Sequence, residues 1–204
     1  MSPLGELESP VATARIAPAV HRFRWSVEDY QKLAGLDLFQ GSRVELIDGE
    51  IFEMSPQNAA HANAIEKLIG SLMRIFAGGF RVRFQLPLVL GPASEPEPDA
   101  AIVAGTYENS SRHPQHAALV VEASDSSLHF DRTVKAGIYA QAGIPEYWIC
   151  NIQDRQLEVH RRPEPDPKCP GKFHYAEVTI VPATGSISSL AMPEARIAVA
   201  DLLP

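Results

Sequence analysis

The segment over residues 117–150 constrains the fold most, because two apolar runs in it enclose one amphipathic stretch. Every residue over 117–121 is apolar and residues 145–152 are mostly apolar and aromatic, which predicts two buried strands. Between them, a turn rich in Ser and Asp leads into residues 130–142, whose apolar positions recur at helical spacing. Strand, helix and strand in this order predict a right-handed crossover within one sheet.

A carboxylate closes the first of these strands. Glu122 follows the apolar run without a polar partner in that strand, and a buried charge of this kind needs a cation. Upstream, Asp99 directly precedes a second short apolar run over 100–104. We therefore expect Asp99 and Glu122 to meet and hold a divalent metal ion, with Lys135 of the following helix directed at the same point. The ordinary alternative is that Lys135, four residues after Asp131, forms a solvent-exposed helical salt bridge.

A β-hairpin is predicted over residues 43–54, where Asp48-Gly49 separates two β-prone runs. A two-residue turn there places Glu45 opposite Phe52, on the hairpin face that also carries apolar side chains. Two interpretations of Glu45 stay open: a carboxylate held against the core, or an edge-strand charge that reaches water.

One histidine opens a predicted helix. Apolar residues at helical spacing predict a helix over 58–77, ended by Gly78-Gly79, and His61 lies on its inward face at the N-terminal end. A histidine in such a position is usually a hydrogen-bonded core residue, and the alternative is that it forms the wall of a functional site.

A strand with one polar face is predicted over residues 80–88. Apolar side chains alternate there with Arg81, Arg83 and Gln85. The two arginines either line a phosphate-binding groove or keep an exposed face in solution.

The length and composition fit one domain of ordinary size over residues 21–204. Residues 1–20 mix Pro, Ala, Ser and Glu without a period, and we expect a flexible N-terminal arm there. Cys150 and Cys169 fit no zinc-ligand spacing, so both are interpreted as free thiols. After the crossover we expect a hairpin strand over 156–162, a proline-rich loop over 163–171, and further short elements over 173–181 and 196–203.

The net charge of −7 restricts how the chain contacts nucleic acid. Proteins that bind duplexes tightly usually present basic residues to the phosphates, so binding here depends on local arginines or on acids masked by a bound metal. No apolar run approaches the roughly 18 residues of a membrane span, and the N-terminus has no secretory signal pattern. We expect no membrane association and a cytoplasmic location.

A family resemblance rests on several of these motifs in one order. They are ELIDGEIFEMSP over 45–56, His61 at a helix start, Pro98-Asp99, and the stretch VVEASDSSLHFDRTVKAGIYAQAGIPEYWI over 120–149. Together they resemble the Uma-type family of restriction endonucleases, formerly classed as a domain of unknown function, within the PD-(D/E)xK nuclease superfamily. The resemblance spans roughly residues 22–162, and the final stretch is its most specific part.

The resemblance implies an α/β (α+β) fold with a restriction-endonuclease-like core, in which helices flank a mixed β-sheet, with the N-terminal β-hairpin and extra C-terminal strands added. Asp99 matches the aspartate of the superfamily motif and Glu122 its second acid. The sequence departs from the motif at Ser124, where lysine is expected, and Lys135 on the following helix takes that place in proteins resembling this one. Glu45, His61 and Gln85 are supporting candidates for contacts to metal-bound water or for positioning.

The resemblance further implies a metal-dependent endonuclease that hydrolyses phosphodiester bonds in DNA, with Mg²⁺ or Mn²⁺ as cofactor and a homodimer as a possible assembly. Mg²⁺ is bound by hard oxygen ligands, so two carboxylates and a substrate phosphate suffice. The alternative is a catalytically inactive nuclease-like domain that binds nucleic acid or protein, which the acidic charge favours. A glycoside hydrolase with two carboxylates gives no role to Lys135.

Overall fold

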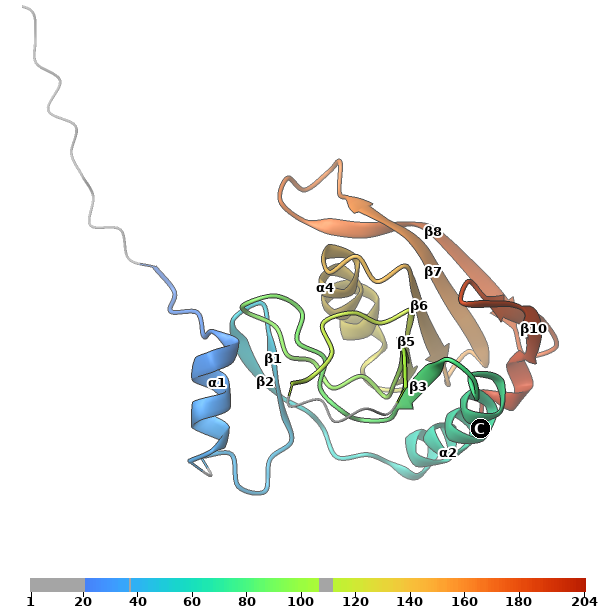
Figure 1. The fold of residues 1–204 in the computed structure, drawn as a ribbon, viewed down its shortest axis with the longest axis horizontal. Helices are drawn as coiled ribbons and strands as arrows, with labels where there is room; N and C mark the ends of the chain where they lie inside the picture. Colours follow the sequence, from blue (N-terminus) through green and yellow to red (C-terminus); the bar gives the residue numbers. More distant parts are fainter. Residues whose placement is uncertain (1–20, 37, 107–111) are drawn as a thin grey trace, which may run out of the picture.

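The fold was analysed in a computed structural model, which describes residues 21–36, 38–106 and 112–204 (Figure 1). The predicted arm over residues 1–20 lies outside the described residues. The elements, in chain order, are α1 (Val27–Ala34), β1 (Val44–Ile47), β2 (Glu50–Glu53), α2 (Ala59–Ile75), β3 (Phe80–Arg83), β4 (Ala100–Ala104), β5 (Leu119–Ser124), α3 (Leu128–Phe130), the π-helical segment η1 (Asp131–Lys135), α4 (Ala136–Gln141), β6 (Glu146–Asn151), β7 (Gln156–Pro165), β8 (Phe173–Pro182), β9 (Ser186–Ser189), β10 (Met192–Ala198) and the 3₁₀ turn η2 (Val199–Asp201).

A six-stranded mixed sheet forms the centre of the molecule, in the order β3-β4-β5-β6-β7-β8. Strands β5 and β6 are parallel and every other neighbouring pair is antiparallel. The helical segment from α3 to α4 connects β5 to β6, so the predicted strand, helix and strand are confirmed. The predicted fold class, a mixed sheet flanked by helices, is confirmed as well.

Each face of the sheet has its own hydrophobic core. On one face, α2 and the C-terminal residues pack against β4 to β7, around Trp148. On the other face, α4 packs around Tyr139 and Tyr147, and the side chain of Ile47 from the hairpin joins this core. Figure 1 shows α2 and α4 on opposite sides of the sheet, with α1 and the hairpin at one end. The hairpin therefore closes the end of the sheet where Asp99 and Glu122 lie.

The predicted hairpin has the expected register, with Ile47 opposite Glu50 and Glu45 opposite Phe52. Asp48 and Gly49 both have positive φ angles, 48° and 76°, as a two-residue type I′ turn requires. The two turn residues therefore set which hairpin side chains lie on the same face as Glu45.

The predicted strand over 80–88 is too long. β3 ends at Arg83, and Gln85 adopts a φ of 50°, which turns the chain out of the sheet. The Gln85 N–H donates to the Pro98 carbonyl at 3.1 Å instead of a strand partner, and Pro87 has no N–H to donate. The alternation of apolar and polar residues thus continues beyond the point at which β3 stops pairing with β4.

Three further boundaries differ from the prediction. The helix expected over 130–142 is interrupted by the five-residue π segment η1. The strand expected over 156–162 continues to Pro165, so the predicted loop begins later. The last predicted element, 196–203, is divided between β10 and the turn η2.

Within the described residues, both cysteines are free: Cys150 is buried in β6 and Cys169 is exposed. None of the helices described here combines the length and the apolar character that crossing a bilayer requires.

Candidate active site

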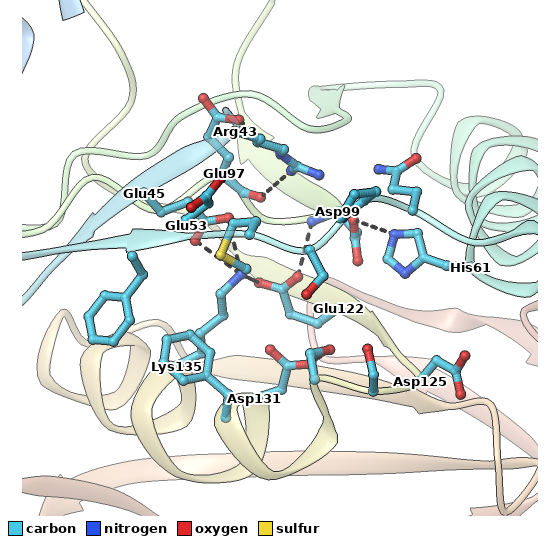
Figure 2. A pocket seen from close by; sticks show the side chains of 18 of the residues that line it. Arg43, Glu45, Glu53, His61, Glu97, Asp99, Glu122, Asp125, Asp131 and Lys135 are labelled. Carbon is cyan, nitrogen blue, oxygen red and sulfur yellow. Dashed lines mark hydrogen bonds and ion pairs between the residues drawn. The ribbon is translucent and has the colours of Figure 1, made fainter. Parts of the chain in front are cut away.

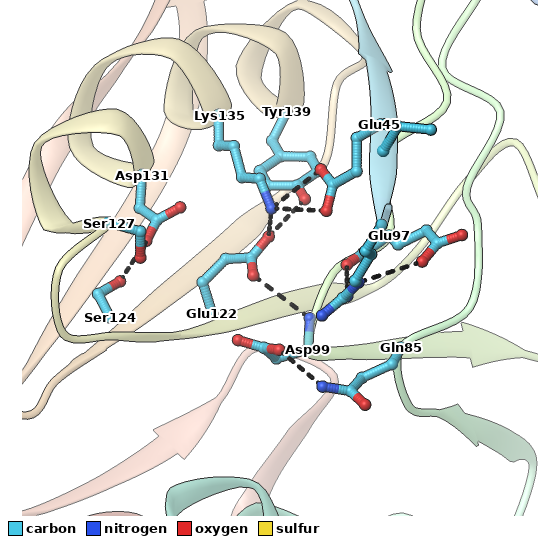
Figure 3. Close-up of polar contacts among 12 residues, drawn as sticks. Glu45, Gln85, Glu97, Asp99, Glu122, Ser124, Ser127, Asp131, Lys135 and Tyr139 are labelled. Carbon is cyan, nitrogen blue, oxygen red and sulfur yellow. Dashed lines mark hydrogen bonds and ion pairs between the residues drawn. The ribbon is translucent and has the colours of Figure 1, made fainter. Parts of the chain in front are cut away.

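The three residues predicted to form a site come together at the end of β5 (Figure 3). Ala100 of β4 pairs with Val121 of β5, so the antiparallel register sets Asp99 beside Glu122. The Asp99 backbone N–H lies 3.3 Å from Glu122 Oε2, and Lys135 Nζ lies 3.0 Å from Glu122 Oε1. The side chains of all three residues are at least nine-tenths buried.

Glu45 shares the same ammonium group. Its Oε2 lies 3.2 Å from Lys135 Nζ, and only 1% of the residue is exposed. The interpretation as an edge charge that reaches water is therefore wrong, and Glu45 is held against the core, because the hairpin face that carries it packs over the site.

Tyr139 is a residue that the sequence did not single out. Its hydroxyl donates to Glu122 Oε1 at 2.8 Å, so one carboxylate oxygen accepts from both tyrosine and lysine. The only signal in the sequence was its position four residues after Lys135, on the same side of a helix.

Asp131 and Lys135 are both buried and have different partners. Asp131 Oδ2 accepts hydrogen bonds from the hydroxyls of Ser124 and Ser127, each at 2.6 Å. Lys135 forms its ion pairs with Glu122 and Glu45. The solvent-exposed salt bridge between Asp131 and Lys135, which was the ordinary alternative, is not formed.

The local charge balance is strongly negative. Four buried carboxylates surround one lysine; they belong to Glu45, Asp99, Glu122 and Asp131. Burial raises the pKa of Glu122 well above its usual value, and Lys135 only partly opposes this shift. Burial alone would lower the pKa of Lys135, but the carboxylates, with Glu122 foremost, outweigh it and the pKa is raised. Lys135 is therefore a permanent cation.

Two of the supporting candidates contact Asp99. Gln85 Nε2 donates to Asp99 Oδ1 at 3.3 Å, and His61 Nε2 lies 3.3 Å from the same oxygen, in ion-pair contact. The Asp99 carboxylate raises the pKa of His61, and burial opposes the shift. Burial also acts to raise the pKa of Asp99, but His61 and the Ala123 N–H outweigh it, so the pKa is lowered. Asp99 is thus held as a carboxylate.

The two arginines of β3 lie elsewhere. Neither Arg81 nor Arg83 lines the pocket at Asp99 and Glu122, and Arg83 Nη2 donates to the Pro87 carbonyl at 3.2 Å. In this structure they do not form a phosphate-binding wall of the pocket.

A pocket of about 300 Å³ opens over these side chains (Figure 2). Its walls come from the hairpin, the start of α2 and the helical segment after β5. The sequence analysis did not select several of the lining residues: Arg43, Phe52, Glu53, Met54, Glu97, Asp125 and Phe130. The register of the hairpin would have pointed to Phe52, which lies opposite Glu45.

The donor set was compared with the needs of a divalent cation. Among the described residues, no three His, Cys, Asp or Glu side chains are arranged as a ready-made metal cluster. Mg²⁺ usually keeps several waters and is bound through one or two carboxylates and substrate phosphates. Asp99 and Glu122 meet that need, and the surplus of buried negative charge favours a cation. The residues present therefore fit such an ion.

The six-stranded mixed sheet flanked by helices is of the nuclease-like class of α/β folds. The chain matches the Uma2 family model, described as "Putative restriction endonuclease", over residues 27–200, and it belongs to this family. The resemblance noted in the sequence is confirmed.

A solved structure is similar in fold. It is the crystal structure of "a putative nuclease belonging to DUF820" from Anabaena variabilis, with a TM-score of 0.65 and 12% sequence identity. The similarity covers 87% of this chain and 97% of that chain. None of the curated proteins matches the sequence.

Proposed function

We propose that the protein is a divalent-metal-dependent endonuclease that hydrolyses phosphodiester bonds in DNA. The observation that carries the proposal is the contact of Lys135 Nζ with Glu122 Oε1 at 3.0 Å, beside Asp99 and within an open pocket. Membership of a family described as restriction endonucleases supports the same reading.

Asp99 and Glu122 would hold the metal, Mg²⁺ or Mn²⁺. When bound, such an ion polarises a phosphoryl oxygen and lowers the pKa of a bound water. Lys135 stays protonated, so its role is to stabilise developing negative charge or to orient the attacking water, and not to remove a proton.

The neighbouring residues position these groups. Tyr139 and Lys135 fix one oxygen of Glu122, and Glu45 fixes the ammonium group of Lys135. Gln85 and His61 approach Asp99 from the other side. The three proposed catalytic groups are thus each restrained by at least one contact.

The test is nicking of supercoiled plasmid DNA by the purified full chain with Mg²⁺ or Mn²⁺, with and without EDTA. Nicking is expected in the native protein and is expected to vanish in folded Asp99→Asn, Glu122→Gln and Lys135→Ala proteins. Asp201→Asn, an exposed acid outside the pocket, is the matched control and should cut like the native protein. Unchanged nicking by the folded Glu122→Gln protein would remove that residue from the site, and RNA substrates in the same panel define the substrate class.

A second candidate is a nuclease-like domain that binds without cutting. The net charge of −7 favours a form of this domain that binds a protein partner, because an acidic chain binds phosphate backbones weakly on its own. Metal-dependent DNA binding without cleavage would select this function. The homodimer and the cytoplasmic location stay predictions from the sequence.

A further inference from the structure

Aromatic side chains form one wall of the active-site pocket. Phe52 lies opposite Glu45 in the hairpin, and its ring centroid is 5.1 Å from that of Phe130, with the two rings tilted by 58°. Both rings are only partly buried and line the same pocket as Asp99 and Glu122. Apolar ring surface is thus available beside the carboxylates.

The reactive groups lie deep in a small cavity. The pocket volume of about 300 Å³ is at the small end of ligand sites, which are about 300–1,000 Å³. Only 5% of Asp99 and 3% of Glu122 are exposed. A closed duplex is stiff and wider than this cavity, so the depth of the site favours a phosphate in a strand that can bend away from its partner.

The negative charge of the pocket walls opposes binding that relies on phosphate contacts alone. Glu53, Glu97 and Asp125 join the buried acids around the pocket, and the side chain of Arg43 is already paired with Glu97 at 3.5 Å. Duplex binding that ignores sequence depends on Lys and Arg contacts to phosphates. Stacking of a base on an aromatic ring needs no positive charge and is available only to an unpaired base.

We infer that this pocket binds one unpaired nucleotide, with its base against the Phe52 and Phe130 rings and its phosphate toward Asp99 and Glu122. The protein then cuts single-stranded or locally melted DNA in preference to closed duplex. This inference rests on the proposed nuclease function and names its substrate class.

The first test compares one labelled strand in three forms: single-stranded, in a closed duplex, and in a duplex with an internal mismatched bubble. With Mn²⁺ and the native full chain, the single strand and the bubble are expected to be cut at least about tenfold faster than the closed duplex. Equal or faster cutting of the closed duplex would overturn the inference and leave the nuclease function standing. If no DNA is cut with any divalent metal, the proposed nuclease function fails. Binding of a single strand then shows whether the pocket holds an unpaired nucleotide.

The second test measures binding without catalysis. A single strand carrying 2-aminopurine is titrated with the native chain in Ca²⁺, and a saturable change in its fluorescence is expected when the base leaves its neighbours in the strand and enters the pocket. Phe52→Leu keeps an apolar side chain against Phe130 and removes the ring, so it is expected to weaken single-strand binding by about fivefold to one hundredfold.

Phe39→Leu is the matched control. Phe39 is also a partly buried aromatic in contact with another ring, Tyr30, at 6.0 Å, and it lies outside this pocket. The Phe39→Leu protein should bind the single strand like the native chain. If Phe52→Leu unfolds by circular dichroism, Phe130→Leu takes its place. A native-like fluorescence change and affinity in the folded Phe52 or Phe130 variant would contradict the inference.

Discussion

At Lys135, one ammonium group is shared by two buried carboxylates, those of Glu122 and Glu45. Removing one partner of a buried ion pair leaves an uncompensated charge in the interior, which typically costs about 3–5 kcal/mol. In metal-free buffer, Lys135→Met is expected to lower the free energy of unfolding by about that amount at pH 7, as measured by urea denaturation.

The pH dependence of this loss has a definite sign. Burial raises the pKa of both Glu122 and Glu45, and removal of the lysine raises both further. A carboxyl whose pKa is higher in the folded state than in the unfolded state destabilises the fold increasingly as pH rises above the unfolded-state pKa. The loss of unfolding free energy caused by Lys135→Met is therefore larger at pH 8 than at pH 5. Lys32→Met removes an exposed lysine paired with Glu28 and should leave the free energy of unfolding close to that of the native chain. A folded Lys135→Met protein as stable as the native chain at pH 8 would refute this account.

His160 makes stability depend on pH from a second position on the same face of the sheet, in the core around Tyr147. It is buried between Tyr147 and Tyr175, and burial lowers its pKa from 6.5 to about 4. A lowered pKa contributes stability that is fully present above about pH 6.5 and is lost as pH falls toward 4. Since one pKa unit corresponds to about 1.4 kcal/mol, the loss is about 3 kcal/mol.

The substitution His160→Phe keeps an aromatic ring and removes the titration. Unfolding free energies measured between pH 7.5 and 4.5 are expected to fall less steeply in this variant than in the native chain. The exposed His129, changed to Phe, should leave the native slope unchanged. Parallel curves for the His160 variant and the native chain would rule out this role.

The residues of the site differed in how far the sequence could specify them. Asp99 and Glu122 were predictable because strand ends are local patterns, whereas the place of Lys135 at the site was implied mainly by the family resemblance. The burial of Glu45 was not predictable, because it depends on how the hairpin packs against a helix some 90 positions later in the chain. Phe130 was missed for the same reason, because its ring meets Phe52 of the hairpin. Tyr139 was missed although its contact with Glu122 lies within the crossover, because helical spacing does not show which strand residue a side chain meets.

At the scale of elements, the Asp48-Gly49 turn carries Glu45 and Phe52 to the site. Gly49 has a φ of 76°, and a Cβ at this position would lie 2.8 Å from Arg24 Cβ. Gly49→Ala is therefore expected to destabilise the protein by about 1–3 kcal/mol through its backbone conformation, and further through the clash. Urea denaturation measures the change, and DNA cutting is expected to fall with it.

Gly41→Ala separates the two costs. Gly41 has a similar φ of 82°, but no atom lies within 4 Å of a Cβ placed there. It is expected to show the conformational cost alone and to keep its cutting activity. Equal losses of stability in the two variants would show that the approach of Arg24 is unimportant.

The π segment marks a limit of sequence patterns. The apolar spacing predicted one continuous helix, on which Asp131 and Lys135 face each other four residues apart. A π turn contains an extra residue, so the two side chains take separate partners, and π turns are frequent at functional sites. One extra residue in a turn hardly changes the apolar period, which is why the sequence did not reveal it.

At the scale of the whole molecule, the crossover and the hairpin were predictable because each is formed by neighbouring residues. The pairing of β3 with β4 and of β4 with β5 joins strands separated by longer connections, and no local sequence pattern specified that order. Only the assembled fold gathers four buried carboxylates around one lysine.

Metal binding at these carboxylates, as proposed, is expected to stabilise the whole fold, because the cation would offset their surplus of negative charge. A ligand that binds only the folded state stabilises it by about 2.7 kcal/mol at one hundred times its Kd. For a chain of 204 residues, each 1 kcal/mol raises Tm by about 2–4 °C, so saturating Mn²⁺ or Mg²⁺ is expected to raise Tm by about 5–10 °C. EDTA should reverse the shift.

The same thermal measurement on three variants locates the ion. Asp99→Asn and Glu122→Gln each remove one negative charge and one carboxylate ligand, so their Tm is expected to respond little to the metal. Asp201→Asn removes an equal charge from an exposed site beside Arg74, and it should keep the native response. If the Asp99 and Glu122 variants are stabilised by the metal as much as the control, the cation binds elsewhere, and the buried carboxylates are balanced by Lys135 and by protons alone.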